Sequence, residues 1–419
     1  MGKTIAEKVL SEHSGTDSHA GDIVIAAVDL CFSQDGTSTM MIRELEAMGF
    51  SRPKTKNGMT MVIDHSSPCP SVDVSRVHER IRSFAHGHAI PVFDVGEGVC
   101  HQVIPEAGLV APGDLVIGAD SHTCTYGALN ACATGLGSTD VAAAAFTGKL
   151  WLRVPATRAV IVEGGFPELV GAKDLALHVT GALGADGATY NSVEYSGGAV
   201  GSMGVDGRMT VANMSVEVGA KFCPFAFDGV ASDWLRSKGV YARRGVSSDD
   251  DADFEGHLEV DATDLVPKVA RPHRVDDVCD ASDLRGVPVD QVFIGTCTNG
   301  RLSDLEAAAS ILKGKHVKSG VRLIVAPASR AVLLDAVEAG VASSLIRSGA
   351  VMVAPGCGPC VGTHAGVPSD GETVLSTANR NFKGRMGNGN GVSIYLASPE
   401  TAAASAIRGE ITDPREVSP

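Results

Sequence analysis

The stretches Gly295-Thr-Cys-Thr-Asn-Gly-Arg301 and Pro355-Gly-Cys-Gly-Pro-Cys360 decide how this sequence is interpreted, because they place three cysteines in two glycine-rich loops. Each loop follows a short apolar run that predicts a buried strand, 292–294 before the first and 351–354 before the second. Thiolates are metal ligands, and three of them leave one position of a metal site open. The two loops therefore predict a catalytic metal site at which substrate binds the metal directly.

On spacing alone, the three cysteines leave several kinds of site open. Cys357 and Cys360 form a Cys-x-x-Cys pair, which occurs in zinc sites and in redox dithiols. A zinc site would need a fourth ligand, and Cys297 has no partner cysteine beside it. A redox dithiol would open a helix after a strand, which Gly358 and Pro359 permit. An iron–sulfur cluster is the third possibility.

The composition is that of a large, acidic globular chain. It has 419 residues, 44% of them hydrophobic, so two or three domains with substantial cores are expected. The formal net charge of −14 argues against nucleic acid or an anionic membrane as a partner. Residues 1–10 predict an amphipathic helix rather than a signal peptide, and no apolar run is long enough to span a bilayer. We therefore expect a cytoplasmic protein with free thiols.

Strand-like and helix-like segments alternate along most of the chain, which is typical of layered α/β folds. The sequence predicts strands at 59–63, 115–117, 158–162, 292–294, 322–325 and 351–353. Ser303-Asp-Leu-Glu306 predicts a capping box at the start of a helix that ends at Gly314. Breaks in the pattern divide the chain into three predicted α/β domains, at 1–155, 156–286 and 287–419.

Side chains suited to acid–base chemistry follow two of these strands. Asp64 and His65 follow the first, Asp120 and His122 follow the second, and His101 lies between the two pairs in the sequence. A carboxylate beside an imidazole fixes its tautomer and raises its basicity, which suits proton transfer. A structural histidine or a helix cap is the alternative for each pair. Because ligand sites in open α/β sheets gather at the carboxyl ends of strands, these groups are predicted to converge with the cysteines.

The segment 376–385 is a candidate anchor for an anionic substrate. It places Arg380, Lys383 and Arg385 in one turn-rich stretch. Guanidinium groups bind carboxylates through two parallel hydrogen bonds. A solvated surface loop is the alternative, but an acidic protein needs a local basic loop to bind a carboxylate substrate.

Taken together, these segments closely resemble the aconitase superfamily of iron–sulfur hydro-lyases. The similarity covers nearly the whole chain and is carried by six motifs: Asp64-His65, Ala119–Thr123, Asp206–Lys221, Gly295–Arg301, Gly356–Cys360 and Asn379–Arg385. Within the superfamily, the chain is most similar to the large subunits of 3-isopropylmalate dehydratases. The large subunits of homoaconitases and dimethylmalate dehydratases look very similar.

The resemblance implies an aconitase-like fold of three α/β domains around one [4Fe–4S] cluster. Cys297, Cys357 and Cys360 would hold three of its irons, and the fourth would act as a Lewis acid on the substrate hydroxyl. Family motifs give catalytic roles to the matching positions Asp64, His65, His101, Asp120, His122 and Glu217. They give substrate-binding roles to Thr39, Ser121, Asn213, Asn379, Arg380 and Arg385.

Two departures from single-chain aconitases affect the expected function. Thr39 falls where aconitase has a glutamine, which argues against citrate as the substrate. The C-terminal swivelling domain, which supplies a catalytic serine in single-chain aconitases, has no counterpart in this sequence. The resemblance therefore implies a separate small subunit that carries this domain and its serine, and a large subunit that catalyses little alone.

The implied reaction is reversible dehydration and rehydration of a small hydroxy dicarboxylate. The leading candidate is the isomerisation of 3-isopropylmalate and 2-isopropylmalate in leucine biosynthesis. Homoaconitate, citraconate and dimethylmalate chemistry are the alternatives within the class. Some aconitase relatives bind RNA when the cluster is lost, but the net charge of −14 and the missing swivelling domain argue against that role here. The prediction is therefore a hydro-lyase subunit with neither nucleic acid nor membrane as a partner.

Overall fold

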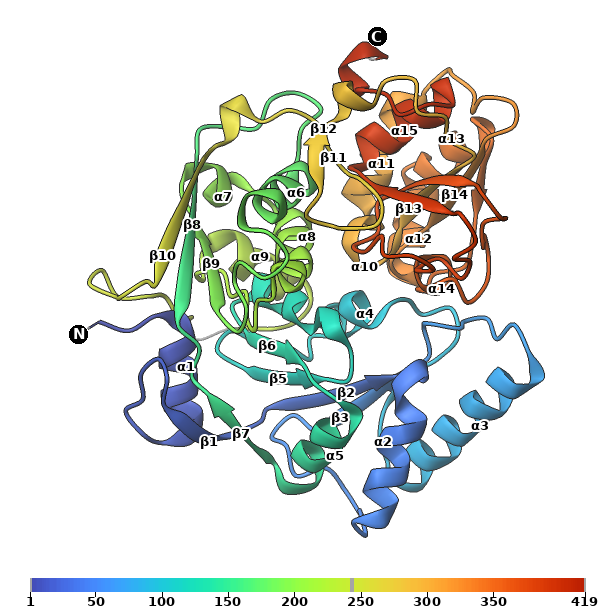
Figure 1. Ribbon diagram of the computed structural model, residues 1–419. Helices are drawn as coiled ribbons and strands as arrows, with labels where there is room; N and C mark the ends of the chain where they lie inside the picture. The colour runs from blue at the N-terminus through green and yellow to red at the C-terminus, as the bar shows by residue number, and fades with distance from the viewer. Residues whose placement is uncertain (1, 242–244, 418–419) are drawn as a thin grey trace.

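The computed structural model describes residues 2–241 and 245–417, which form three lobes on separate β-sheets (Figure 1). The first lobe, at the bottom of Figure 1, contains a five-stranded parallel sheet of order β4-β3-β2-β5-β6. Its strands are β2 (Leu30–Gln34), β3 (Met59–Val62), β4 (Val92–Phe93), β5 (Leu115–Gly118) and β6 (Cys132–Gly135). An antiparallel ribbon joins β1 (Ile23–Ala27) to β7 (Lys149–Arg153). The helical segments of this lobe are α1 (Ile5–Ser14), α2 (Asp35–Ala47), α3 (Val72–Gly87), α4 (Cys100–Glu106), η1 (Ser121–Leu129) and α5 (Ser138–Thr147).

The second lobe, green in Figure 1, is built on the three-stranded parallel sheet β10-β8-β9. Its strands are β8 (Thr157–Glu163), β9 (Ser192–Ser196) and β10 (Gly256–Asp261). Its helical segments are α6 (Ala172–Leu183), α7 (Gly198–Ser202), α8 (Val205–Ser215), η2 (Val216–Val218), α9 (Gly229–Ser237) and η3 (Ala262–Asp264).

The third lobe, orange and red in Figure 1, contains the seven-stranded sheet β12-β11-β17-β16-β13-β14-β15. Its strands are β11 (Lys268–Ala270), β12 (Val278–Asp280), β13 (Gln291–Gly295), β14 (Arg322–Ala326), β15 (Ala350–Met352), β16 (Thr373–Ser376) and β17 (Ser393–Leu396). The strands from β13 to β17 pair in parallel, and β11 pairs antiparallel with both neighbours. Its helical segments are η4 (Ala281–Leu284), α10 (Thr296–Asn299), α11 (Leu302–Leu312), α12 (Arg330–Glu338), α13 (Val341–Arg347), α14 (Gly358–Val361), α15 (Pro399–Arg408) and η5 (Pro414–Glu416).

The six predicted strands are confirmed as β3, β5, β8, β13, β14 and β15. The predicted capping box at Ser303 was wrong by two positions, because α11 begins at Leu302 with Arg301 as its N-cap. The carboxylate of Asp304, not Glu306, accepts the free backbone N–H of the N-cap at 2.9 Å. No helix among the described residues is both long and apolar enough to cross a membrane.

The residue ranges of the three sheets can be compared with the predicted domain boundaries. The first sheet and the β1–β7 ribbon end at Arg153, and the second sheet uses residues 157–261. Strands β11 and β12 join the third sheet although both precede the predicted boundary at 286. The division into three domains stays a prediction, with the segment 268–280 paired to the third sheet.

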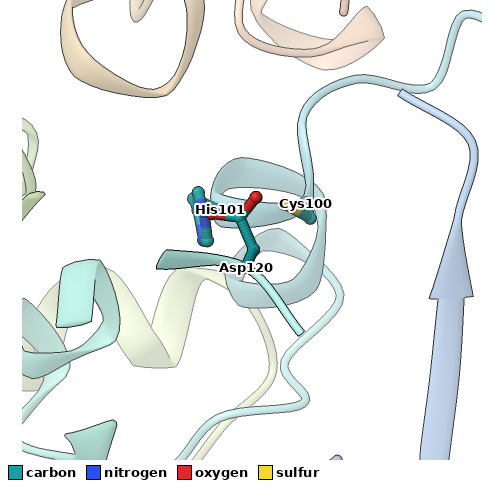
Figure 2. Close-up of side chains that lie close together, drawn as sticks. All are labelled: Cys100, His101 and Asp120. Atoms are coloured by element: carbon teal, nitrogen blue, oxygen red, sulfur yellow. Dashed lines mark hydrogen bonds and ion pairs between the residues drawn. The ribbon is translucent and has the colours of Figure 1, made fainter. Parts of the chain in front are cut away.

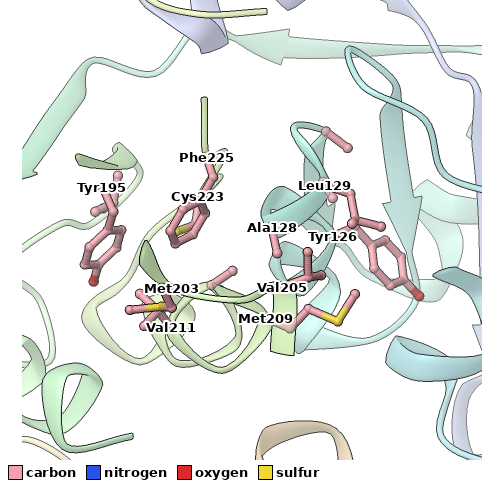
Figure 3. Packing of buried hydrophobic residues seen from close by; sticks show 14 of the residues in the cluster. Tyr126, Ala128, Leu129, Tyr195, Met203, Val205, Met209, Val211, Cys223 and Phe225 are labelled. Atoms are coloured by element: carbon pink, nitrogen blue, oxygen red, sulfur yellow. The ribbon is translucent and has the colours of Figure 1, made fainter. Parts of the chain in front are cut away.

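One hydrophobic core runs from the first lobe into the second (Figure 3). Tyr126 and Leu129 of η1 belong to the same buried cluster as Met209 of α8. In the same cluster, the rings of Tyr195 and Phe225 stack with their centroids 5.6 Å apart. Because close-packed cores resist deformation, the segment that follows β5 is held in a fixed position relative to α8.

Candidate active site

One cleft collects most of the predicted site residues. It contains about 380 Å³ of empty space, part of it open to solvent. Its lining comes from the first and third lobes: Asp64, His65, Val99, Cys100, His101, Asp120, Ser121, His122, Cys297, Cys357, Cys360, Asn379 and Arg385. The predicted convergence of strand-end residues with the cysteines is therefore found in the structure.

The first acid–base pair follows β3. His65 Nδ1 lies 2.7 Å from Asp64 Oδ1, and the Asp64 side chain is fully buried. The turn is held by Asp35 at the start of α2, whose carboxylate accepts the backbone N–H of His65 at 2.7 Å and of Asp64 at 3.2 Å. Burial lowers the pKa of His65, but the carboxylates of Asp64 and Asp120 outweigh it and raise that pKa well above its ordinary value. His65 is thus set to be protonated near neutral pH.

Asp120, which follows β5, is shared by three histidines. Its Oδ1 lies 2.8 Å from His101 Nε2 and accepts the backbone N–H of His122 at 2.9 Å. Its Oδ2 lies 3.4 Å from His65 Nε2. Figure 2 shows the side chains of His101, on α4, and Asp120 next to one another. Burial raises the pKa of Asp120, but His101 and the other hydrogen-bond donors outweigh it and hold that pKa well below its ordinary value. Asp120 therefore stays ionised and links the two predicted acid–base pairs.

The third histidine connects all three lobes. His122 Nε2 lies 2.8 Å from Glu217 Oε1, an atom that also accepts Arg380 Nε at 2.7 Å. A second guanidinium nitrogen of Arg380 donates to Ser121 Oγ at 3.1 Å. Burial raises the pKa of Glu217, but His122 and Arg380 outweigh it and lower that pKa below its ordinary value. Glu217 does not line the cleft itself, but its contacts fix the side chains of His122 and Arg380.

The three cysteines are buried on the third-lobe wall of the cleft. Asn213 Nδ2 lies 3.4 Å from Cys297 Sγ, and Asn379 Nδ2 lies 3.7 Å from the same sulfur. Arg385 donates to Cys360 Sγ at 3.3 Å. Burial raises the pKa of Cys297 to about 11. The hydrogen bond from Cys357, together with Arg385, holds the pKa of Cys360 well below its ordinary value.

The arrangement of the thiols fits a group larger than a single metal ion. Around one tetrahedral zinc, sulfurs at about 2.3 Å from the metal lie roughly 3.8 Å apart. Among the described residues, the three thiol sulfurs do not form a set in which all atoms lie within 4.8 Å of one another. N–H donors on two of the sulfurs stabilise thiolate charge. The buried Nε of Arg385 and Nδ1 of His101, two cleft residues, have no hydrogen-bond partner among the described atoms. The donor set therefore fits an iron–sulfur cluster with substrate beside it.

The close approach of backbone explains the glycines in the cluster loops. A Cβ on Gly356 would lie 2.9 Å from the Asp64 carbonyl oxygen, so a side chain does not fit there. The next residue, Cys357, donates its backbone N–H to that same carbonyl at 2.7 Å. The first-lobe acid–base turn and the third-lobe cysteine turn are thus in direct backbone contact.

Thr39 is the predicted site residue that the structure does not bring to the cleft. It lies exposed on α2 and is not among the cleft's lining residues. Asn213, Glu217 and Arg380 also do not line the cleft, but each contacts a residue that does.

Sequence reasoning missed two buried residues that position the site. Asp35 holds the Asp64–His65 turn, as described above. Arg301 is 1% exposed and donates to the Cys297 carbonyl at 2.7 Å and to the Thr298 carbonyl at 3.0 Å, which fixes the cysteine turn. Arg301 ends the motif Gly295–Arg301, and Asp35 lies shortly before Thr39, so proximity in sequence to Cys297 and to Thr39 was the available signal.

Comparison with known proteins gives the same picture over the full length of the chain. The model of the aconitase family (aconitate hydratase) matches residues 7–285 and 280–409. The chain is 49% identical over 416 residues to "3-isopropylmalate dehydratase large subunit 1" of Methanopyrus kandleri, covering 99% of both chains. It is 50% identical over 420 residues to "3-isopropylmalate dehydratase large subunit 1" of Thermotoga maritima, again covering 99% of both.

A relative with a different name is nearly as similar. The "probable methanogen homoaconitase large subunit" of Methanosarcina mazei is 47% identical over 395 residues, which cover 94% of this chain and all of that protein. The expected superfamily and its α/β fold agree with these matches. The chain belongs to the aconitase family.

Proposed function

We propose that this chain is the large subunit of a [4Fe–4S] hydro-lyase that interconverts 3-isopropylmalate and 2-isopropylmalate by removing and re-adding water. The observation that carries the proposal is one cleft in which two histidine–carboxylate pairs face three buried cysteines. Full-length similarity to proteins named 3-isopropylmalate dehydratase large subunits supports the substrate and its place in leucine biosynthesis. Membership of the aconitase family supports an iron–sulfur cofactor.

Cys297, Cys357 and Cys360 would hold the cluster. When bound, it supplies a Lewis-acidic iron for the hydroxyl and carboxylate of the substrate. The amides of Asn213 and Asn379 and the guanidinium of Arg385 supply N–H donors to the cysteine sulfurs. Such donors orient the ligands and stabilise their charge.

His65 and His101 are the proton-handling groups of the proposed site. The raised pKa of His65 keeps a proton on the ring near neutral pH, so His65 can donate it to a departing hydroxyl. Asp120 lies between the two rings and stabilises positive charge on either one. The contact with Glu217 fixes the ring of His122, which lines the cleft and can orient water or substrate there.

The basic residues would bind the substrate's carboxylates. Arg385 lines the cleft, and its buried Nε has no hydrogen-bond partner among the described atoms, so one donor is free for a carboxylate. Arg380 does not line the cleft, but Glu217 and the cleft residue Ser121 fix its guanidinium beside it. Thr39 is proposed for no role at this cleft, because the structure places it outside.

A small subunit completes the proposed enzyme. The relatives are named as large subunits, and the chain matches them over nearly their whole length. We infer that the partner brings the swivelling domain and the serine that removes the proton from carbon. The cytoplasmic location and the lack of nucleic acid or membrane partners stay predictions.

Homoaconitate chemistry is the second candidate, favoured by the 47% identity to the Methanosarcina mazei protein. The two candidates share the dehydration step and differ in the substituent on the dicarboxylate. The groups that handle protons and bind carboxylates in this cleft serve both.

The test is turnover by the reconstituted complex. The chain is purified anaerobically with its small subunit, loaded with iron and sulfide, and supplied separately with 3-isopropylmalate, homocitrate, dimethylmalate and citramalate. We expect fastest turnover of 3-isopropylmalate, little turnover by the large subunit alone, and about four irons per chain that are lost in Cys297→Ser, Cys357→Ser and Cys360→Ser variants. Zinc in place of iron, or turnover of none of these acids by an iron-loaded complex, would overturn the proposal.

A further inference from the structure

Lys173 is a buried lysine that none of the roles above uses. It is the second residue of α6 in the second lobe and is 1% exposed. Its Nζ donates to the carbonyl of Thr377 at 2.9 Å and to that of Ala378 at 2.6 Å, and lies 3.8 Å from the sulfur of Met214. The two carbonyls belong to the third lobe and immediately precede Asn379 and Arg380. One side chain of the second lobe thus fixes the backbone from which two site residues emerge.

The contacts of Lys173 satisfy its hydrogen bonds but not its charge. Both acceptors are neutral carbonyls, and no carboxylate among the described residues lies within ion-pair distance of its Nζ. A buried charge without a counter-charge is strongly unfavourable. The structure must therefore offer Lys173 a negative charge that does not touch it directly.

The nearby carboxylates are occupied elsewhere. Asp174 accepts the backbone N–H groups of Lys268 at 2.8 Å and Gly171 at 3.1 Å. Asp304 accepts Asn299 Nδ2 at 2.9 Å and the backbone N–H of Arg301 at 2.9 Å. Burial raises the pKa of Glu400 to about 8, so Glu400 is mostly neutral near pH 7, whereas Asp174 and Asp304, with pKa values of about 6, stay mostly ionised but accept hydrogen bonds from other groups.

The cysteines are a further source of negative charge beside Lys173. Its Nζ holds the Ala378 carbonyl, and the side chain of the next residue, Asn379, lies 3.7 Å from Cys297 Sγ through Nδ2 and 4.0 Å from Cys360 Sγ through Oδ1. Burial lowers the pKa of Lys173 to about 7. Lys173 belongs to the same wall as the cysteine site, since its neighbours Met214, Leu177 and Ala176 share one buried cluster with all three cysteines. Arg385, the cation that touches Cys360, stands on the substrate side of the same sulfur.

We infer that Lys173 is the buried counter-cation of the three-cysteine site and the positioning residue for the strand end that carries Asn379 and Arg380. When the cysteines lose their protons on loading, three thiolates carry more negative charge than the cluster core carries positive charge, so the loaded site is an anion. The ammonium of Lys173 balances that charge through the protein interior. In the unloaded chain, the same ammonium is poorly compensated. This inference rests on the proposed cluster.

The test compares protein with and without the reconstituted cluster, in variants that separate the charge of Lys173 from its hydrogen bonds. Lys173→Met removes both, Lys173→Gln keeps a donor for one carbonyl, and Lys173→Arg keeps the charge. Lys221→Met is the matched control, because Lys221 is a partly buried lysine of the same lobe whose burial lowers its pKa to about 8, and its ammonium lies over the ring of Tyr190, outside the cleft that the cysteines line. For each protein, the melting temperature is measured before and after anaerobic reconstitution, and the release of iron to a chelator is timed.

A counter-cation predicts opposite effects in the two states. Lys173→Met and Lys173→Gln should leave the melting temperature of the unloaded chain unchanged or raised, yet reduce the increase that loading produces. Iron release should quicken about tenfold or more, and the cluster's midpoint potential should become more negative because reduction adds a further negative charge. Lys173→Arg and Lys221→Met should keep the wild-type increase and potential.

The outcomes also separate this inference from the proposed function. A wild-type chain that binds no iron refutes the cluster itself. A wild-type chain that loads, with Lys173→Met and Lys173→Gln showing the wild-type loading increment and potential, overturns the counter-cation role. A role limited to holding the loop would lower both melting temperatures equally and leave the potential unmoved, which also overturns it.

Discussion

Replacing Asp120 by asparagine tests the shared carboxylate that links the two acid–base pairs. The variant keeps the size of the side chain and one oxygen acceptor, so the backbone N–H of His122 can still donate to it. It removes the negative charge that lies 2.8 Å from His101 Nε2 and 3.4 Å from His65 Nε2. The change therefore acts on the proton-handling groups while leaving the turn after β5 in place.

The expected loss follows from these distances. A hydrogen bond to a charged group contributes about 1.5–3 kcal/mol, and each 1.4 kcal/mol is roughly a factor of ten in rate. The 2.8 Å contact to His101 falls in that range, whereas the 3.4 Å contact to His65 is longer and contributes less. We expect kcat to fall about 10- to 100-fold with a smaller change in KM.

The pH profile carries the sharper prediction. Burial lowers the pKa of His65, and the carboxylates of Asp64 and Asp120 raise it beyond that effect. Removing one carboxylate lowers this pKa, so His65 loses its proton at a lower pH than in the wild type. If His65 donates a proton to the departing hydroxyl, the alkaline limb of kcat moves to lower pH.

The assay is dehydration of 3-isopropylmalate by the reconstituted complex, followed across pH by absorbance of the alkene product. Asp114→Asn serves as the control, because Asp114 is a mostly buried carboxyl of the first lobe that lies outside the cleft. Wild-type kcat and an unmoved alkaline limb in Asp120→Asn, at equal iron content, would refute the assignment of Asp120 and His65 to proton transfer.

Three further variants test the positioning of the site. Burial raises the pKa of Asp35, but hydrogen bonds, led by the one from His78, outweigh burial and lower the pKa from 3.8 to about 2. Asp35→Asn should therefore lower the free energy of unfolding by about 2 kcal/mol above pH 4. This difference should shrink as the pH falls towards 2. Urea unfolding across pH measures it, and a difference that does not change with pH would contradict the charge argument. Gly356→Ala should displace the Cys357 turn from Asp64 and at least halve the iron bound after reconstitution, whereas Gly371→Ala, with nothing near its added Cβ, should not. Arg385→Lys should raise KM about tenfold or more, because lysine lacks the Nε–H that Arg385 keeps free for a carboxylate; an unchanged KM would remove Arg385 from substrate binding.

The sequence predicted the parts of the fold that depend on local pattern. The strands that precede the cysteine loops and the Asp64–His65 turn were predictable because short apolar runs bounded by glycine and polar residues have few alternatives. The start of α11 was missed because two acidic residues, Asp304 and Glu306, each match a capping pattern, and only the backbone geometry selects Asp304. The short strands β11 and β12 were missed because β11 joins the third sheet through β17, far along the chain, and β12 pairs only with β11.

The site was predictable where motif and strand end coincide, and less so elsewhere. His65 and Asp120 follow β3 and β5, so the topology of the first sheet brings them to one edge, and Cys297 lies at the corresponding end of β13 in the third sheet. Thr39 matched a family position in sequence, but it lies about one helical turn after Asp35 on α2, where its side chain is exposed. Lys173 left no readable signal, because a lysine at the start of an amphipathic helix is ordinarily a solvated residue.

The division of labour between the lobes explains why a site of this kind needs the whole chain. The cleft is lined by the first lobe, which brings the histidines, and by the third lobe, which brings the cysteines and Arg385. The second lobe contributes no lining residue among those described, but two of its side chains contact the residues that position the site. Glu217 joins His122 to Arg380 through one oxygen atom, and Lys173 holds the backbone that precedes Arg380. Because Glu217 pairs with charged groups of both other lobes and Lys173 donates hydrogen bonds to the third, a shift of the second lobe would disturb the proton-handling groups and the carboxylate-binding groups together. The second lobe therefore sets the distance between the two chemistries that the proposed reaction must combine.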